Sequence, residues 1–182
     1  MEERAPLLPD ILARGLDVVF VGAAPSLWAA QVGHYYAGPR NRFWLLLYQA
    51  GFTPRLLQPE EDVTLPSYGI GLVALFHHIA SNANHLLPEP SPTQREQLIE
   101  RLIEAAPRWV CYNGKDVYRM VTGEECRRWG EQKERLGLAR TFVVISSSGR
   151  ADGWGHERLA LYKELYDCVY STHAPESKLP RA

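Results

Sequence analysis

Short runs of almost continuous apolar residues recur along this chain, with segments of helical periodicity between them. The runs lie at 18–21, 70–76, 109–112 and 141–145. A strand that is apolar on both sides must be covered on both faces, and such strands are typical of a parallel sheet between two layers of helices. The alternation therefore predicts an α/β fold, a three-layer α/β/α sandwich around a short parallel sheet.

Three of the intervening segments carry helix signals. The apolar segment 43–50 is followed by Gly51, and a glycine at this position commonly closes a helix. Ser91 predicts the start of a second helix, because a proline follows it and Gln94 lies three residues on, as in a capping box. A third helix is expected over 156–170. The residues expected on the buried faces of the second and third helices are Leu98, Ile99, Leu102 and Ile103, and Leu159, Leu161, Tyr162, Leu165, Tyr166 and Val169.

Length and composition indicate one compact domain. The chain has 182 residues, 46% of them apolar and 23% charged, which excludes a fully disordered protein. From 173 to 182, prolines and charges replace apolar periodicity, so we expect a domain over 1–172 followed by a flexible tail over 173–182. The formal net charge of −1 gives no global basic signature. Nucleic acid is still a possible partner, because phosphate binding needs only a local cationic face.

Cysteine usage and the apolar pattern favour a cytoplasmic protein. Cys111, Cys126 and Cys168 are odd in number and widely spaced, so neither a disulfide framework nor a zinc knuckle is expected. The N-terminus has acidic residues and prolines where a signal peptide would need an apolar core. The apolar stretch 18–30 is interrupted by glycine, proline and serine and is too short to span a bilayer. We therefore expect a soluble protein with no membrane contact and no metal.

Four loops are the places to look for a site. In parallel sheets, ligands bind beyond the carboxyl ends of the strands. These ends are predicted at Val21, Phe76, Tyr112 and Ile145, so the residues that follow them are the candidates.

The loop after the first strand combines small, aromatic and basic residues. Small residues at 22–26 allow a ligand to approach backbone N–H groups closely. Further along, Tyr35 and Tyr36 offer a stacking face for a planar ring, and Arg40 and Arg42 offer contacts for phosphates. The same residues also fit a tight turn between strand and helix, with the aromatics packed in a small core. From spacing alone, both interpretations stay open.

This segment also resembles a known family. Residues 18–53, VVFVGAAPSLWAAQVGHYYAGPRNRFWLLLYQAGFT, are similar to the mismatch-specific uracil and thymine DNA glycosylases of the uracil-DNA glycosylase superfamily. Their pattern is a strand, then G-I-N-P followed by Gly or Ser, an aromatic segment, N-R-F-W, and a helix that ends in A-G-F-T. The resemblance continues in family order through YGIGLVAL, YNGKDVYR and VVISSSGR, and so covers most of the chain.

The resemblance implies an enzyme that acts on DNA. Such enzymes flip the target nucleotide out of the duplex, because the bond between sugar and base cannot be reached inside the stack. They then cleave that bond through a transition state with positive charge on the sugar and negative charge on the base, which positioned dipoles and a held water stabilise. The resemblance also implies a four-stranded parallel sheet, a DNA groove across its carboxyl edge, and no metal or organic cofactor.

Site residues follow from the alignment of these motifs. Tyr36 falls where the family places the aromatic ring that stacks on the flipped base. Arg150 is expected to fill the space that the base leaves, with Gly149 giving the loop its reach. Lys115, in a Gly-Lys turn, is a candidate phosphate contact, although the residue taken alone is more typical of an ordinary solvated lysine. The full expected sets are Gly22, Ala23, Ala24, Tyr36 and Asn41 for the base, and Lys115, Ser146, Ser147, Ser148, Gly149 and Arg150 for DNA.

The chain departs from the family where the attacking water is usually held. The family asparagine is Ala24 here, and Val73 and Ala74 replace a second polar position. Alanine has no side-chain group that can hydrogen-bond a water. One interpretation is that His77 or His78, after the second strand, positions the water, with Asn82 and Asn84 a little further on. The others are a slow reaction driven by backbone dipoles, and a DNA-binding module that recognises lesions without cutting.

The sequence as a whole predicts a monofunctional DNA glycosylase of base excision repair. Its expected substrate is duplex DNA with a deaminated or mismatched base, above all uracil opposite guanine, with thymine and hypoxanthine as further candidates. We expect it to act as a monomer in a bacterial-type cytoplasm and to leave an abasic site. The alternative is a lesion-recognising DNA-binding protein with impaired catalysis or altered specificity, because Ala24 replaces the usual catalytic asparagine.

Overall fold

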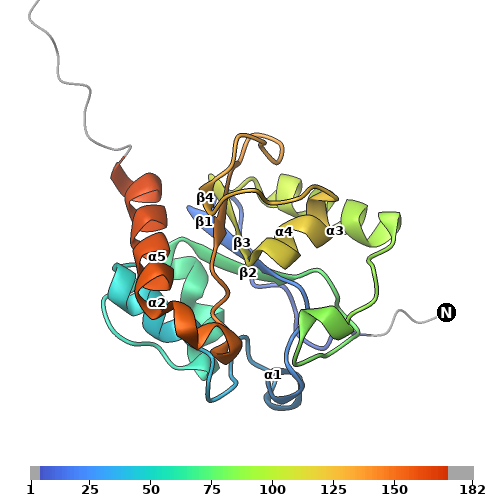
Figure 1. Cartoon of the computed structure of the whole chain (residues 1–182), viewed down its shortest axis with the longest axis horizontal. Coiled ribbons are helices and arrows are strands. Elements are labelled where there is room, and N and C mark those ends of the chain that lie inside the picture. The colour runs from blue at the N-terminus through green and yellow to red at the C-terminus, as the bar shows by residue number, and fades with distance from the viewer. Residues whose placement is uncertain (1–4, 172–182) are drawn as a thin grey trace, which may run out of the picture.

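A computed structural model describes residues 5–171, which form a three-layer sandwich with the sheet as the middle layer (Figure 1). The strands are β1 (Val18–Gly22), β2 (Ile70–Ala74), β3 (Trp109–Asn113), β4 (Gly130–Glu131) and β5 (Arg140–Val144), and their order across the sheet is β2-β1-β3-β5-β4. Strands β2, β1, β3 and β5 are parallel to their neighbours, and β4 pairs antiparallel with β5. The carboxyl ends of the four parallel strands therefore share one edge.

The prediction of an exclusively parallel, four-stranded sheet is wrong in one respect. All four predicted strands are present and parallel, but β4 makes the sheet five-stranded and mixed. This strand has two residues, a glycine and a glutamate, and the glycine has a positive φ of 89°. It therefore has no apolar run and no alternation, which are the two signals that predict a strand.

The helices cover the two faces of the sheet in pairs. The α-helices are α1 (Leu27–Val32), α2 (Phe43–Ala50), α3 (Pro92–Ala105), α4 (Lys115–Thr122) and α5 (Gly155–Tyr170), and the 3-10 helices are η1 (Pro59–Tyr68), η2 (Asn84–Leu86) and η3 (Gly149–Trp154). Helices α2 and α5 lie on one face, and α3 and α4 lie on the other, as Figure 1 shows.

Alternate residues of each strand enter the two cores. On β1, Phe20 points into the core under α2 and α5, while Val19 and Val21 point into the core under α3 and α4. The Phe20 ring centroid lies 5.2 Å from that of Phe43 on α2 and 6.0 Å from that of Tyr162 on α5. Burial on both faces is the reason that these strands appear as continuous apolar runs in the sequence.

The predicted helix ends are confirmed by their hydrogen bonds. The amide of Gln94 donates to Ser91 Oγ (3.2 Å) and the amide of Ser91 donates to Gln94 Oε1 (2.9 Å), which completes the capping box at the start of α3. Gly51 closes α2 with φ of 98°, a left-handed conformation that glycine adopts without strain. Both signals are local, so the sequence was sufficient to predict them.

The buried faces of α3 and α5 are narrower than predicted. In α3, Leu98 and Leu102 are buried, but Ile103 is 52% exposed at the outer side of the helix. Leu98 and Leu102 lie one turn apart and form the contact row, so that Ile103 projects towards the turn at Gly137. In α5 the fully buried apolar residues are Tyr162, Leu165 and Val169, with Leu159, Leu161 and Tyr166 partly buried against the same core.

The structure also bears on the cysteines and on the expected absence of a membrane span. All three cysteines are free thiols, and burial raises the pKa of the Cys111 thiol well above its ordinary value. Within residues 5–171, none of the helices combines the length and the apolar character that crossing a membrane requires. The predicted tail, 173–182, lies outside the described residues.

Candidate functional site

A cavity of about 780 Å³ opens at the carboxyl edge of the parallel strands. Its walls come from the loops after β1, β2, β3 and β5, which are the four loops that the sequence singles out. The volume lies in the range of sites that hold a small molecule or a cofactor. Representative wall residues from the four loops in turn are Ala24, Asn82, Lys115 and Ser146.

The floor of the cavity is the backbone of the first loop. The carbonyl of Gly22 accepts a hydrogen bond from the Leu75 amide (2.9 Å), and the carbonyl of Ala23 accepts one from the Phe76 amide (2.8 Å). These bonds continue the pairing of β1 and β2 beyond their ends and fix the loop at the sheet edge. A Cβ on Gly22 would lie 3.2 Å from the Tyr36 hydroxyl, so glycine allows the tyrosine to approach closely.

Tyr36 forms one wall and is held in a strained conformation. Its φ is 54°, in the left-handed region that side chains other than glycine rarely adopt. The ring packs on Phe43 with centroids 4.2 Å apart and planes tilted by 30°. Burial raises the pKa of the Tyr36 hydroxyl well above its ordinary value, and a hydrogen bond with the Asn113 side chain acts in the opposite direction. The ring is therefore neutral, buttressed from behind and fixed against the cavity.

The carboxylate of Asp62 holds the Tyr35 backbone and the His34 side chain, and this role was not predicted from the sequence. Its carboxylate is 3% exposed and accepts a hydrogen bond from the amide of Tyr35 (3.0 Å), while His34 Nδ1 lies 3.3 Å from the same group. The Tyr35 side chain is buried at the edge of the cavity, in the first hydrophobic core. Each of the two open interpretations therefore fits one residue of the aromatic pair. Tyr35 packs in the core, and Tyr36 forms a wall of the cavity.

Each residue of the N-R-F-W motif has a separate structural task. Asn41 lines the cavity, and its Oδ1 accepts a hydrogen bond from the Phe43 amide (3.0 Å) at the start of α2. The amide of Arg42 donates to the carbonyl of Ser147 (2.8 Å). Phe43 supports Tyr36, as described above, and Trp44 Nε1 donates to the carbonyl of Tyr35 (3.2 Å). The motif therefore positions the aromatic wall and joins it to the loop after β5.

The serine loop after β5 is anchored at its centre. Asn113, at the end of β3, donates from Nδ2 to Ser147 Oγ (3.0 Å) and accepts the Ser147 amide at Oδ1 (3.0 Å). Ser147 is 0% exposed, so its side chain does not face the cavity, and its predicted contact with DNA phosphates stays a prediction. Its side chain is used to hold the loop, whereas Ser146 and Ser148 line the cavity. Asn113 lies in one of the quoted motifs but was not predicted as a site residue.

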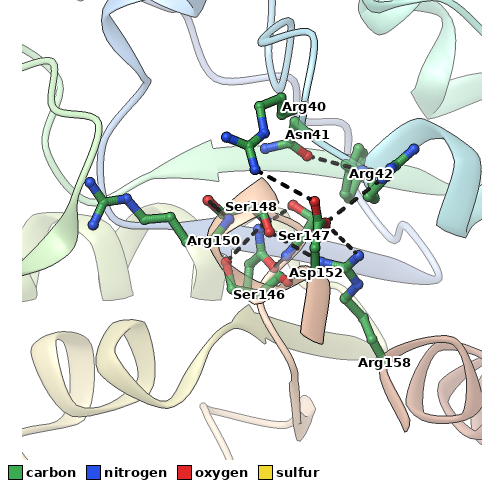
Figure 2. Close-up of polar contacts among 11 residues, drawn as sticks. Arg40, Asn41, Arg42, Ser146, Ser147, Ser148, Arg150, Asp152 and Arg158 are labelled. Carbon is green, nitrogen blue, oxygen red and sulfur yellow. Dashed lines mark hydrogen bonds and ion pairs between the residues drawn. The ribbon is translucent and has the colours of Figure 1, made fainter. Parts of the chain in front are cut away.

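Arg158 supports the same loop from α5 (Figure 2). Its guanidinium is almost fully buried, and Nη1 donates to the carbonyls of Ser146 (3.2 Å) and Ser148 (3.1 Å). Its Nη2 donates to Asp152 Oδ1 (3.2 Å). This arginine was not predicted, because its position on an amphipathic helix gives no signal of contacts with a distant loop.

Three cations stand around the opening. Arg40, Lys115 and Arg150 line the cavity and form what we call the cationic rim. Figure 2 shows Arg150 extending away from the Asp152 cluster. Lys115 Nζ lies 4.6 Å from the centroid of the Trp129 ring and 3.5 Å from the carbonyl of Arg127, which restrains it.

Gly149 allows the two basic segments to touch. A Cβ at this position would lie 2.7 Å from Arg40 Cβ and 3.0 Å from the Arg40 carbonyl oxygen. A larger residue would separate the serine loop from the segment that follows Tyr36. The structure thus gives Gly149 a packing role, and its predicted role of giving the loop its reach stays a prediction.

Comparison with known proteins places the chain in a family. The sequence model of the uracil DNA glycosylase superfamily matches residues 9–168. The chain belongs to this superfamily. A solution NMR structure of a candidate uracil DNA glycosylase from Methanosarcina acetivorans is similar, with a TM-score of 0.58 and 21% sequence identity over 89% of this chain and 96% of that one. This likeness shows a shared fold, and the family match confirms the resemblance at the level of the superfamily.

Superfamily membership indicates DNA as the partner and DNA glycosylase activity in general. The five residues predicted to bind the base, namely Gly22, Ala23, Ala24, Tyr36 and Asn41, all line the cavity. Among the residues predicted to contact DNA, all except Ser147 also line it. These placements bring the predicted residues together, and their roles are taken up below as proposals.

The two histidines predicted to replace the family asparagine do not lie in this cavity. His77 Nε2 lies 3.1 Å from Asp10 Oδ1 and 3.0 Å from Arg101 Nη2, in a cluster that joins the N-terminal segment to α3. His78 is exposed. After these two residues the chain turns back to the cavity at Ser81, whose amide donates to the carbonyl of Pro25 (2.9 Å).

The segment that follows Ser81 brings polar side chains to the cavity. Asn82, Asn84 and His85 line the cavity, and Asn82 Oδ1 accepts a hydrogen bond from the Leu27 amide (3.1 Å) at the start of α1. The segment is therefore bonded directly to the loop that contains Ala24. Val73 and Ala74 also line the cavity, so the wall is apolar at the strand ends and polar further out. Across residues 5–171, no group of three His, Cys, Asp or Glu side chains is arranged to hold a metal.

Proposed function

We propose that this protein is a monofunctional DNA glycosylase of base excision repair. It takes duplex DNA with a deaminated or mismatched base, above all uracil opposite guanine, flips that base out and hydrolyses its N-glycosidic bond. The observation that carries the proposal is that Tyr36 and Arg150, from loops more than a hundred positions apart in the sequence, line one cavity floored by the first loop.

The cavity suits a flipped base for physical reasons. The fixed ring of Tyr36 offers a flat apolar wall, and the backbone of the first loop offers dipoles for the polar edge of a base. The cationic rim surrounds the opening, where the phosphates next to the flipped nucleotide would pass. Arg150 is exposed and extends from the rim, as a side chain that fills the vacated stack must.

The position of the attacking water follows from the return of the chain after β2. Asn84 and His85 are the polar wall residues of this segment, and Asn82 already uses its carbonyl oxygen on Leu27. We assign the water to Asn84 or His85 rather than to His77 or His78. An asparagine or histidine can accept a hydrogen bond from a water and orient it, which Ala24 cannot do.

A lesion-binding protein without catalysis is the second candidate function. The observation that favours it is the apolar patch of Ala24, Val73 and Ala74 in the cavity wall. Duplexes with uracil, thymine, hypoxanthine or hydroxymethyluracil opposite guanine, incubated with the protein and then treated with alkali, separate the two. Strand breaks at any of these bases, absent from a duplex with cytosine, support the enzyme. Tight lesion binding with no breaks supports the binding protein.

A further inference from the structure

A single carboxylate, that of Asp152, faces three arginines beside the cavity (Figure 2). Its Oδ1 lies 3.2 Å from Arg158 Nη2 and 3.8 Å from Arg42 Nε, and its Oδ2 lies 3.9 Å from Arg40 Nη2. One negative charge cannot balance three guanidinium groups. The cluster therefore keeps an excess of positive charge next to the site.

The three contacts are of two kinds. The Arg158 contact is a hydrogen bond, and the Arg158 side chain is 5% exposed, so this pair is a permanent part of the fold. The contacts of Arg40 and Arg42 are longer than a hydrogen bond, and these side chains are 81% and 51% exposed. Exposed ion pairs of this kind contribute little and are readily exchanged.

The backbone fixes where these arginines stand. The amide of Arg42 donates a hydrogen bond to the Ser147 carbonyl in the serine loop, and Arg40 is in contact with Gly149. The backbone of both residues therefore stays beside the serine loop when their guanidinium groups change partner. A backbone phosphate offers two oxygens and one negative charge, as the carboxylate does, and arginine binds it in a forked geometry.

We propose that Asp152 is an internal substitute for a DNA phosphate. In the free protein it orients Arg40 and Arg42, and on binding a backbone phosphate takes over both guanidinium groups while Asp152 keeps Arg158. Asp152 thereby lowers the affinity for DNA in general and leaves lesion recognition to the cavity. This inference rests on the proposed function, because it requires DNA to bind at the rim.

The test is the affinity of Asp152→Asn for a short duplex with one uncleavable abasic-site analogue, measured by fluorescence anisotropy over a range of salt. The amide still accepts the hydrogen bond from Arg158, so the loop keeps its support. We expect binding about three- to tenfold tighter than wild type. The slope of log K against log salt should steepen by about one.

Two comparisons make the result specific. Glu104→Gln removes the same charge from the last turn of α3, at the amino edge of the sheet, and should change affinity much less. In an Arg40→Gln, Arg42→Gln background, Asp152→Asn should give no gain. Affinity that is unchanged or weaker in Asp152→Asn, an equal gain in Glu104→Gln, or a gain that persists without the arginines would overturn the inference.

The inference and the proposed function fail in different ways. Thermal unfolding of each variant shows whether the fold is kept. If Asp152→Asn is unfolded, Asp152→Ser is measured in its place, with the same expected gain in affinity and the same two comparisons. No gain in that variant overturns the exchange. If neither the wild type nor any folded variant binds the duplex, the proposed function is wrong and this inference falls with it.

Discussion

At the scale of single residues, the site requires a close approach of Tyr36 to Gly22. The tyrosine is held at a φ of 54°, and a Cβ on Gly22 would lie 3.2 Å from its hydroxyl. Strain of this kind costs about 1–3 kcal/mol and is found where a function needs a fixed geometry. The fold tolerates it here because Phe43 and Asn113 hold the ring from other sides.

We expect Gly22→Ala to impair activity more than stability. The added methyl group displaces the tyrosine by a few tenths of an ångström, and small misplacements in a site can cost up to about a hundredfold in rate. Single-turnover excision should fall at least about tenfold, with the midpoint of thermal unfolding only a few degrees lower. Gly153→Ala is the matched control, since a Cβ at Gly153 meets nothing within 4 Å. Equal rates in the two variants would contradict the role of this contact.

We expect the replacement of Arg158 to lower the free energy of unfolding. Arg158→Ala leaves the carbonyls of Ser146 and Ser148 without their donor and Asp152 without its buried partner. The buried guanidinium makes three charge-assisted hydrogen bonds, one of them to the partly exposed Asp152, and its removal costs about 2–3 kcal/mol, which urea unfolding would detect. The exposed Arg135, which donates to the Leu138 carbonyl, is the control, and its replacement by alanine should cost less than about 0.5 kcal/mol. A similar loss in both variants would show that Arg158 does not anchor the loop.

At the scale of elements, the loop after β2 contains the residues that we propose as substitutes for the family asparagine. We expect His85→Ala or Asn84→Ala to lower single-turnover excision by about a hundredfold, because the attacking water loses its hydrogen-bond partner. His78→Ala should leave the rate unchanged, since this exposed residue of the same loop lies outside the cavity wall. A loss of rate in His78→Ala alone would restore the prediction made from the sequence.

The range of an interaction along the chain explains which features the sequence predicted. The four parallel strands and the cap at Ser91 depend on neighbouring residues, so their patterns are complete within one segment. The pair Asn113–Ser147 joins positions 34 residues apart, and Tyr35–Asp62 joins positions 27 apart. Such pairs leave no periodic signal. The expected placement of His77 failed for the same reason, because its position depends on Asp10 and Arg101.

The family resemblance supplied what periodicity could not. It assigned Tyr36 and Arg150 to one site, and both line the same cavity. It could not place Ser147, because the motif gives residue types and not their burial. A serine between two cavity-lining serines has the same letter whether it faces a ligand or the core.

At the scale of the whole molecule, charge is local rather than global. The formal net charge is −1, while three cations gather at one opening. Because Arg150 is assigned to the vacated stack, the proposed phosphate contacts are Arg40, Arg42 and Lys115. DNA binding should therefore depend on salt with a log–log slope of about −3, since each such contact contributes about −0.9. Anisotropy titrations with a lesion-containing duplex at several salt concentrations would measure it. A slope near zero would show that the rim does not contact phosphates.

The two borders of the sheet have a consequence for how copies of this chain meet. On the β2 side, Ile11 exchanges hydrogen bonds with Leu72 in both directions (2.9 Å each), and on the β5 side the two-residue β4 runs antiparallel. Short or covered borders discourage a foreign strand from adding itself to a sheet. At high concentration, copies of this chain should consequently resist aggregation by strand addition. The edge that is left for binding is the carboxyl edge of the parallel strands, where the four loops meet.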